Sequence, residues 1–436
     1  MINAVLRPAR LHSGTGRHLL KHLVVDVNGI WETSVGSDYE MPWDVFDPWD
    51  DTDINFDPWE PGYGYSGVYD PEAGFNDFMS LFSTIGAYET TEVVAYFDDG
   101  SDLTGVSKWW GGCLSESGMI YGIPYNDTRI LKINPRTNKV SFFGEFEGTA
   151  KWKGGVVGRN GKIYCVPHNS TSVLVIDPSD DSTSLIEGLS ESIEKWGGGV
   201  LGPDGYIYCC PDPSSSGTTI GSMLVIDPSS DIAFTRSSIM RGVGMALSRN
   251  GYALTAYCGE NYPSYSRIDL SSGIETQSGF YTSSYYDGQC GAVLAPNGKV
   301  YCPIGRVGVL PTSGSSLINT KTVCLTDSPL SLSRLSKTYS PYRAHIFSGG
   351  VLAPNGHIYC VPLTFGFIDR IDPTDNAIAS IAAVSSDANK WAGGVLAPNG
   401  RIYFIPHNYN KVLELSNVGE MNSKTVLLTH PYVNKF

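Results

Sequence analysis

The sequence predicts an all-β fold built from tandem repeats, and three observations support that prediction. Glycine (49), proline (26) and tyrosine (25) are abundant among the 436 residues, while only 17% of residues are charged. This composition is typical of many strands joined by tight turns. A turn glycine recurs at spacings of 43, 44, 46, 47, 58 and 44 residues, at Gly118, Gly161, Gly205, Gly251, Gly298, Gly356 and Gly400. Seven copies at this period predict a seven-bladed β-propeller over residues 107–436, with one four-stranded blade per copy.

The copy at residues 151–194 shows how each blade is expected to form. Its four strands are predicted at Gly154–Val157, Lys162–Val166, Ser172–Asp177 and Ser184–Ile186. The Gly-Gly pair lets neighbouring backbones approach near the axis. Asn160-Gly161 supplies the positive φ of a tight hairpin, and Pro178 ends the third strand because proline cannot donate the next ladder bond.

Two further residue types are expected to serve the blades themselves. Tyrosines recur at one position of the second strand and are predicted to fill the space between blades: Tyr164, Tyr208, Tyr301, Tyr359 and Tyr403. The nine cysteines lack the spacing of a zinc site or a disulfide framework. We expect all nine to be reduced residues in or near the core.

Charge divides the chain into two parts. Residues 1–106 hold 19 Asp and Glu against 4 Lys and Arg, a balance of −15, whereas the remainder holds 25 against 26, a balance of +1. This shift predicts an N-terminal acidic arm or small β segment over 1–106 and the propeller over 107–436. Within the first part, the stretches 22–27 and 30–35 flank Asn28-Gly29 and are predicted to form a hairpin.

The acidic arm contains a short tandem motif of tryptophan, proline and acidic residues. It reads Trp43-Asp44, then Asp47-Pro48-Trp49-Asp50, then Asp57-Pro58-Trp59-Glu60. Its prolines exclude a long helix or a central strand. Tryptophans in an acidic segment favour docking on a partner subunit, through Trp43, Asp47, Trp49, Asp57 and Trp59. The alternative is a solvated linker.

No metal site is expected in the chain. Asp51-x-Asp53-x-Asn55-x-Asp57 resembles the front of a calcium loop, but its sixth position is Phe56 and its twelfth is Gly62. An EF-hand requires glycine and glutamate at those two places.

The pattern Lys-Trp-x-Gly-Gly-Val-Leu-x-Pro-(Asn/Asp)-Gly-x-Ile-Tyr-x-x-Pro describes residues 195–211 and 390–406. It is similar to seven-bladed propeller repeats of phage, algal-virus and bacterial surface or virion-associated proteins, over about 107–436. The acidic arm ahead of a compact domain also resembles the anchoring part of a phage tail or capsid accessory protein. Two copies depart from the pattern: the fourth has Arg241-Gly242-Val243-Gly244, and the fifth carries extra residues between Arg306 and Arg343. The resemblance implies a virion protein made in the host cytoplasm, with other virion subunits as partners of residues 1–106.

One face of the predicted propeller collects candidate ligand-binding residues. The loops entering the first strand and leaving the second strand of each blade meet there. The candidates are Lys108, Trp109, Asn126, Lys151, Trp152, His168, Asn169, Lys195, Trp196, Lys390, Trp391, His407 and Asn408, with Tyr125 beside Asn126. Indole faces, amides and ammonium groups suit a glycan or an anionic polymer. Under the alternative interpretation the tryptophans wedge between blades.

The sequence assigns no catalytic residue and no cofactor. Residues unique to their blades map near the same face: Asp127, Asp212, Glu260, Asp287, Arg306 and His345. Two of the carboxylates would suit an acid/base pair, but no spacing selects them. The chain has no phosphate-binding glycine motif and no nucleophile elbow. The near-neutral propeller speaks against nucleic acid, and no apolar stretch approaches the ~18 residues of a membrane span.

These observations together favour a non-enzymatic virion structural protein within an oligomeric assembly. The arm is expected to anchor it to a tail or capsid, while the propeller contacts a host-surface glycan, a receptor or a neighbouring subunit. Two alternatives stay open: a carbohydrate-active hydrolase or lyase using Asp212, Glu260 or Asp287, and a bacterial protein-interaction scaffold.

Overall fold

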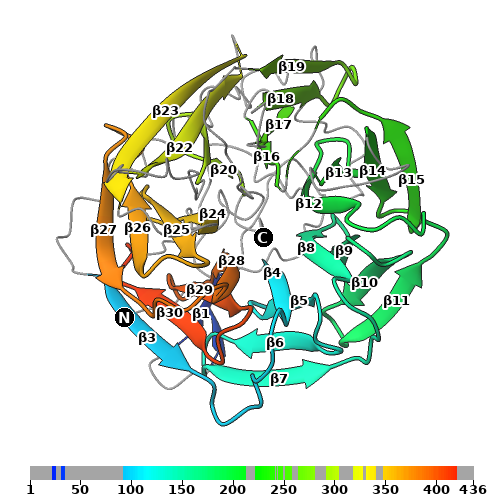
Figure 1. Ribbon diagram of the computed structural model, residues 1–436. Coiled ribbons are helices and arrows are strands. Elements are labelled where there is room, and N and C mark those ends of the chain that lie inside the picture. The colour runs from blue at the N-terminus through cyan, green and yellow to red at the C-terminus, as the bar shows by residue number, and fades with distance from the viewer. Residues whose placement is uncertain are drawn as a thin grey trace, which may run out of the picture.

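The computed structural model confirms the all-β propeller fold. Seven four-stranded antiparallel sheets radiate from a common centre (Figure 1), and no helix occurs in the described ranges. The structure describes residues 92–212, 221–240, 242, 244–248, 251–257, 264–279, 291–303, 318–327, 330–339 and 347–419, with two short strands at 22–25 and 31–34.

The strands of each blade are numbered from the axis outwards. Blade 1 comprises β4 (Trp109–Leu114), β5 (Ile120–Pro124), β6 (Ile130–Asn134) and β7 (Lys139–Phe143). Blade 2 comprises β8 (Trp152–Val157), β9 (Ile163–Pro167), β10 (Val173–Asp177) and β11 (Ser182–Ile186). Blade 3 comprises β12 (Trp196–Leu201), β13 (Ile207–Pro211), β14 (Ser222–Asp227) and β15 (Ile232–Ser237). Blade 4 comprises β16 (Ala246–Leu247), β17 (Tyr252–Tyr257), β18 (Ser264–Asp269) and β19 (Glu275–Gly279).

Three blades complete the ring. Blade 5 comprises β20 (Val293–Leu294), β21 (Val300–Cys302), β22 (Ile318–Asp327) and β23 (Leu330–Tyr339). Blade 6 comprises β24 (Phe347–Leu352), β25 (Ile358–Pro362), β26 (Phe367–Ile371) and β27 (Ile378–Ala383). Blade 7 comprises β28 (Trp391–Leu396), β29 (Ile402–Pro406), β30 (Val412–Ser416) and β3 (Val93–Phe97). The innermost strands contact one another in the order β4, β8, β12, β16, β20, β24 and β28, and β28 contacts β4 again.

The first glycine of each Gly-Gly pair has a role that the sequence did not reveal. Gly111, Gly154, Gly198, Gly349 and Gly393 all have positive φ, between 71° and 90°. In all five of these blades the ladder between the first two strands shifts by one residue beside this glycine. In blade 7, for example, Trp391 pairs with Pro406 and Gly394 pairs with Phe404, so three steps on one strand match two on the other. Such a bulge needs a residue that adopts the left-handed conformation, and it re-aims the side chain before it.

The second glycine serves the close packing that we expected. A Cβ added at Gly394 would lie 2.8 Å from Cγ2 of Val351 in the neighbouring blade. A Cβ added at Gly112 would lie 2.8 Å from Cδ1 of Ile405. These distances are shorter than carbon atoms tolerate, so blades 7 and 1 require glycine here to approach the preceding blade.

Apolar cores lie between adjacent blades, as the repeated tyrosines predicted. Tyr403 packs between blades 7 and 1, Tyr164 between blades 2 and 3, and Tyr359 between blades 6 and 7. Each hydroxyl also reaches the next blade: that of Tyr164 donates to Asp231 Oδ1 at 2.8 Å, and that of Tyr301 donates to Asn376 Oδ1 at 2.6 Å. The tyrosine therefore supplies both buried area and a directional bond at these junctions, whereas the hydroxyl of Tyr208 donates within its own blade, to Asp204 Oδ2 at 2.6 Å.

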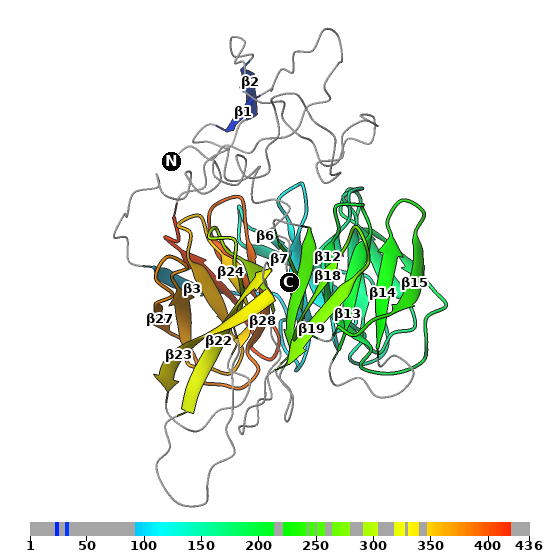
Figure 2. The ribbon, with the colours of Figure 1, turned by 90° about the horizontal axis from the view of Figure 1, so that it is seen from above.

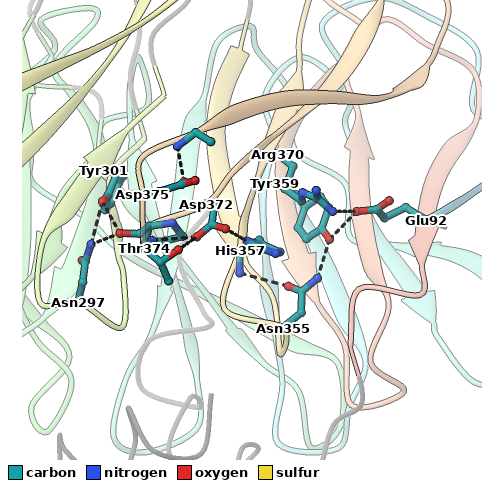
Figure 3. Close-up of polar contacts among 12 residues, drawn as sticks. Glu92, Asn297, Tyr301, Asn355, His357, Tyr359, Arg370, Asp372, Thr374 and Asp375 are labelled. Carbon is teal, nitrogen blue, oxygen red and sulfur yellow. Dashed lines mark hydrogen bonds and ion pairs between the residues drawn. The ribbon is translucent and has the colours of Figure 1, made fainter. Parts of the chain in front are cut away.

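Strand β3 closes the ring, which moves the domain boundary predicted at residue 107. Residues Val93–Phe97 pair antiparallel with β30, from Val93 opposite Ser416 to Phe97 opposite Val412. Glu92 precedes this strand and accepts from Arg370 Nη1 at 2.6 Å and from the Tyr359 hydroxyl at 3.1 Å (Figure 3). The fourth strand of blade 7 thus comes from the segment assigned to the arm, and the propeller begins at residue 93.

The disc has two distinct faces. Strands run from one face to the other (Figure 2), so antiparallel pairing places alternate connections together. We call the face carrying the Asn-Gly and Asp-Pro turns the turn face, and the opposite one the Lys-Trp face. Strand β3 starts and β30 ends at the turn face, where Asn355 N donates to Val418 O at 3.1 Å. Both connections to the rest of the chain therefore leave from the turn face.

Other sequence predictions can be placed directly. Strands β1 (His22–Val25) and β2 (Trp31–Ser34) pair as predicted, with Val25 opposite Trp31. Some of the extra residues of blade 5 lengthen its outer hairpin, because β22 and β23 have ten residues each. Six of the nine cysteines are free and buried, as expected: Cys113, Cys165, Cys209, Cys210, Cys302 and Cys360.

Candidate functional site

The four Lys-Trp pairs lie at the Lys-Trp face but are buried. Trp109, Trp196 and Trp391 are fully buried, and Trp152 is 3% exposed. Each indole donates from Nε1 to a carbonyl at the start of the third strand of its own blade, as Trp391 does to Lys411 O at 2.9 Å. The prediction that these indole faces are presented to a ligand is therefore wrong, and the alternative of tryptophans wedged between blades is correct.

The lysines of these pairs hold the loops together. Lys108, Lys151 and Lys390 are buried, and each ammonium donates to three backbone carbonyls. Lys195 is buried too and donates to Ser192 O at 2.8 Å. Burial lowers the pKa of Lys108, as of Lys151 and Lys195, to about 8. Most of these lysines are therefore still in the ammonium form at neutral pH. Their N–H groups donate to backbone carbonyls and not to an anionic polymer.

The three candidate asparagines are also used by the fold. Asn126 Oδ1 accepts from Ala150 N at 2.7 Å, Asn169 Oδ1 from Glu194 N at 2.8 Å, and Asn408 Oδ1 from Ser107 N at 2.7 Å. Each donor residue belongs to the next blade and has a positive φ of 50° to 53°. The amides therefore secure the left-handed residue that precedes each lysine.

The two candidate histidines behave differently, because they meet residues that break the repeat. His168 and His407 are each 3% exposed, and their Nδ1 atoms lie 3.3 Å from Trp196 O and 2.9 Å from Trp109 O. Around them lie side chains whose residue type is not repeated at the same position in the other blades. We call this group the axial cluster; it comprises Trp110, Tyr125, Lys153, His168, Asp212 and His407.

The fold explains why the axial cluster is at the axis. Trp110 and Lys153 occupy the position directly after the repeated tryptophan, where the glycine bulge re-aims the side chain. Tyr125, His168, Asp212 and His407 each follow the last residue of a second strand. All six therefore project from the inner two strands of blades 7, 1, 2 and 3, at the Lys-Trp face.

Aromatic rings form the outer part of the cluster. Trp110 and Tyr125 are partly exposed, and their ring centroids lie 5.5 Å apart. The ring of His407 meets Trp110 edge-on at 4.9 Å, and the ring of Tyr125 lies 5.8 Å from both histidines. Trp110 thus differs from the other four propeller tryptophans, which are buried.

A buried ion pair forms the inner part. Lys153 Nζ lies 2.7 Å from Asp212 Oδ2, with side-chain exposures of 2% and 1%. The same ammonium lies 5.0 Å from the Trp110 ring centroid, a cation–π distance. His168 Nδ1 lies 3.9 Å from Asp212 Oδ2. The opposite charges of Lys153 and Asp212 compensate each other, which offsets part of the cost of removing both groups from water.

Burial determines the protonation of the cluster. It lowers the pKa of His168 to about 4, helped by the charge of Lys153. It likewise lowers the pKa of His407 to about 4. Burial raises the pKa of Tyr125 to about 12, with a contribution from Asp212. Both imidazoles and the phenol are therefore neutral at pH 7.

Sequence reasoning overlooked Trp110 and Lys153. Both follow a repeated tryptophan at a position that varies between copies, and this variation is the signal that would have found them. The sequence marks Asp212 only as a candidate acid. Another such candidate, Asp127, is paired with Arg129, whose Nε lies 2.9 Å away.

Several predicted residues lie outside the described part of the chain. They are the arm residues Trp43, Asp47, Trp49, Asp57 and Trp59, and the candidates Glu260, Asp287, Arg306 and His345. Within the described ranges, no group of three or more His, Cys, Asp and Glu side chains is placed to hold a metal ion. No helix in those ranges is long and apolar enough to cross a membrane.

Comparison with known proteins supports the architecture. The chain is a β-propeller. A streptogramin B lyase is 14% identical, with a TM-score of 0.56 over 75% of this chain and 98% of the lyase. A hydrazine synthase of Kuenenia stuttgartiensis is 17% identical, with a TM-score of 0.56 over 74% of this chain and 99% of its own. A copper-containing fungal alcohol oxidase is 13% identical, with a TM-score of 0.51 over 77% of both chains.

These similarities concern the fold alone, because the identities are low and propellers carry many functions. No protein-family model and no curated protein sequence matches the chain.

Proposed function

We propose that the protein is a non-enzymatic attachment protein of a virion. The segment before residue 92 anchors it to a tail or capsid, and the Lys-Trp face of the propeller binds a host-surface glycan through the axial cluster.

The observation that carries this proposal is the opposite placement of tether and cluster. The chain enters the ring through β3 and leaves it after β30, both at the turn face. Trp110 and Tyr125 lie at the other face, near the axis. A propeller held by the turn face presents its axial cluster outwards, which is the arrangement that an attachment protein needs.

Two further observations support it. The side chains of the four repeated Lys-Trp pairs are buried. Among the described residues, the partly exposed aromatic rings of the axial cluster are therefore best suited to contact a ligand. Binding sites combine apolar and aromatic surface with a few placed polar groups. Residues 1–91 hold 15 Asp and Glu against 4 Lys and Arg, a balance of −11, whereas residues 92–436 hold 29 against 26, a balance of −3. This contrast suits the two parts of the molecule to different partners.

Glycan binding is tested with the full-length protein and a panel of host-surface oligosaccharides. We expect Trp110→Ala to weaken binding at least about tenfold, because truncating an aromatic residue at the centre of a binding site costs about 2 kcal/mol, and about 1.4 kcal/mol is a factor of ten. Tyr206→Ala is the matched control: Tyr206 is an exposed aromatic residue beside the turn glycine Gly205, on the turn face. Equal loss in both variants, or no loss in Trp110→Ala, would remove the cluster from the proposal.

Anchoring is tested by deleting residues 1–60. This deletion keeps β3 in place, so the propeller retains its closing strand. The shortened protein is expected to remain soluble and to stay out of assembled particles. If it assembles as the full chain does, anchoring by this segment is wrong.

The same samples test the competing enzymatic function. Oligosaccharide is incubated with the protein and its chain length is followed over time. Shortened products that disappear in Asp212→Asn would replace the attachment function with a carbohydrate-active one.

A further inference from the structure

The two histidines of the axial cluster have a defined tautomer. His407 Nδ1 lies 2.9 Å from the carbonyl oxygen of Trp109, and His168 Nδ1 lies 3.3 Å from that of Trp196. A carbonyl oxygen only accepts, so Nδ1 must carry the hydrogen in each neutral ring. The second nitrogen, Nε2, is then an acceptor in both rings. The cluster therefore contains two imidazole acceptors, and the centroid of each imidazole ring lies 5.8 Å from that of the Tyr125 ring.

The charges of the axial cluster are already balanced. Lys153 and Asp212 are bonded to each other at 2.7 Å and are almost fully buried. Four further ammonium groups of this face, those of Lys108, Lys151, Lys195 and Lys390, donate to backbone carbonyls. A ligand carboxylate or sulfate would therefore find no unused cation among these residues, and the Nε2 acceptors of the two imidazoles have no proton to donate to it. Desolvating such an anion without a partner is unfavourable.

Hydroxyl groups fit this environment better than anions do. A hydroxyl donates to an imidazole Nε2 and carries no charge to desolvate. The C–H faces of a sugar ring pack against aromatic faces, here the partly exposed rings of Trp110 and Tyr125, which lie 5.5 Å apart.

We propose that the axial cluster selects an uncharged, hydroxyl-rich ligand, a neutral glycan, and that His168 and His407 accept hydrogen bonds from its hydroxyl groups. This inference rests on the proposed function and names the ligand class of that same site.

The test compares neutral oligosaccharides with counterparts that differ only by an added sialic acid or uronic acid, using the full-length protein at pH 7. The neutral member of each pair is expected to bind at least about tenfold more tightly. His168→Asn and His407→Asn are the informative variants, because the asparagine amide keeps the donor near the Nδ1 position and removes the Nε2 acceptor. Each is expected to weaken binding of the neutral glycan about fivefold, as loss of one hydrogen bond does.

The outcomes separate this inference from the proposed function. Tighter binding of the acidic counterpart, or unchanged affinity in both asparagine variants, overturns the inference; if Trp110→Ala still loses binding, the proposed function stands. A panel in which no glycan binds overturns both. Fluorescence and circular dichroism of each variant must match those of the unmodified protein. Should either asparagine variant fail this check, His168→Gln and His407→Gln replace it: their amide reaches the Nε2 position, and retained binding there supports the histidine contacts.

Discussion

Acid should destabilise the propeller through its two buried histidines. His168 and His407 are each 3% exposed, and burial lowers the pKa of both from the ordinary 6.5 to about 4. The folded chain thus binds fewer protons than the unfolded chain between these two values. Stability is consequently unaffected above pH 6.5 and falls as the pH drops below it.

The size of the loss follows from the two pKa values. At pH 5 the unfolded imidazole is almost fully protonated and the folded one is mostly neutral. Each histidine then lowers the free energy of unfolding by about 2 kcal/mol relative to neutral pH, and the pair by about 4 kcal/mol. The loss levels off below pH 4, where the folded imidazoles also take up protons, at about 3 kcal/mol for each.

The assay is urea unfolding followed by tryptophan fluorescence at pH 7, 6 and 5. The double variant His168→Asn, His407→Asn keeps a donor for each backbone carbonyl but does not titrate. Its free energy of unfolding should fall by about 4 kcal/mol less than that of the unmodified protein between pH 7 and pH 5. Tyr125→Phe is the control: it alters the same cluster without a titrating group in this range, so its pH dependence should match the unmodified protein.

All three proteins contain the same other acid-sensitive groups. The difference between proteins in how the free energy of unfolding depends on pH therefore reports the two imidazoles alone. Equal slopes in the double variant and the unmodified protein would refute the reasoning, because the histidines would then titrate alike in the folded and unfolded chain.

Two further predictions concern the fold. A fragment of residues 92–436 should unfold cooperatively on heating, like the full chain. A fragment of residues 107–436 should have a free energy of unfolding about 5 kcal/mol lower, or fail to fold, because it lacks the packed side chains of Val94 and Phe97 and the Glu92 contacts. Equal melting temperatures of the two fragments would contradict the closing role of β3. Lys390→Met should lower the free energy of unfolding in urea by about 3 kcal/mol, because the Lys390 ammonium donates to buried carbonyls. Lys139 is exposed, so Lys139→Met should change that free energy by less than about 0.5 kcal/mol. Similar losses in both variants would argue against the carbonyl contacts.

The blades could be predicted because their signals are local and repeated. A strand, an Asn-Gly hairpin and an Asp-Pro stop each depend on neighbours within a few residues. Seven copies also average out the variation of any one copy. The tyrosines were predicted correctly between blades for the same reason: a large residue that recurs at one position must serve what all copies share, which is the contact with the next copy.

The candidate site could be predicted only in part. The repeated Lys-Trp pairs were assigned to a ligand because ammonium and indole groups are common in binding sites. The Lys390 ammonium donates to the carbonyls of Leu363 and Phe365 of the preceding blade and to that of Asp387. Partners so far apart in the sequence cannot be predicted from a local pattern. The sequence places His168 and His407 at the correct face, but it does not predict their contacts with Trp110, Tyr125 and Asp212.

The sequence by itself determined the propeller, its hairpin turns and the contrast between an acidic segment and a neutral one. Those properties follow from the period, the turn chemistry and the charge count, which need no three-dimensional information. Only the tertiary structure decided where the ring closes, because Val93 pairs with Ser416 across most of the chain. It also decided which repeated residues are buried and which unlike residues meet at the axis. Ring closure brings blade 7 against blade 1, so that His407 touches Trp110, and no spacing along a chain records that contact.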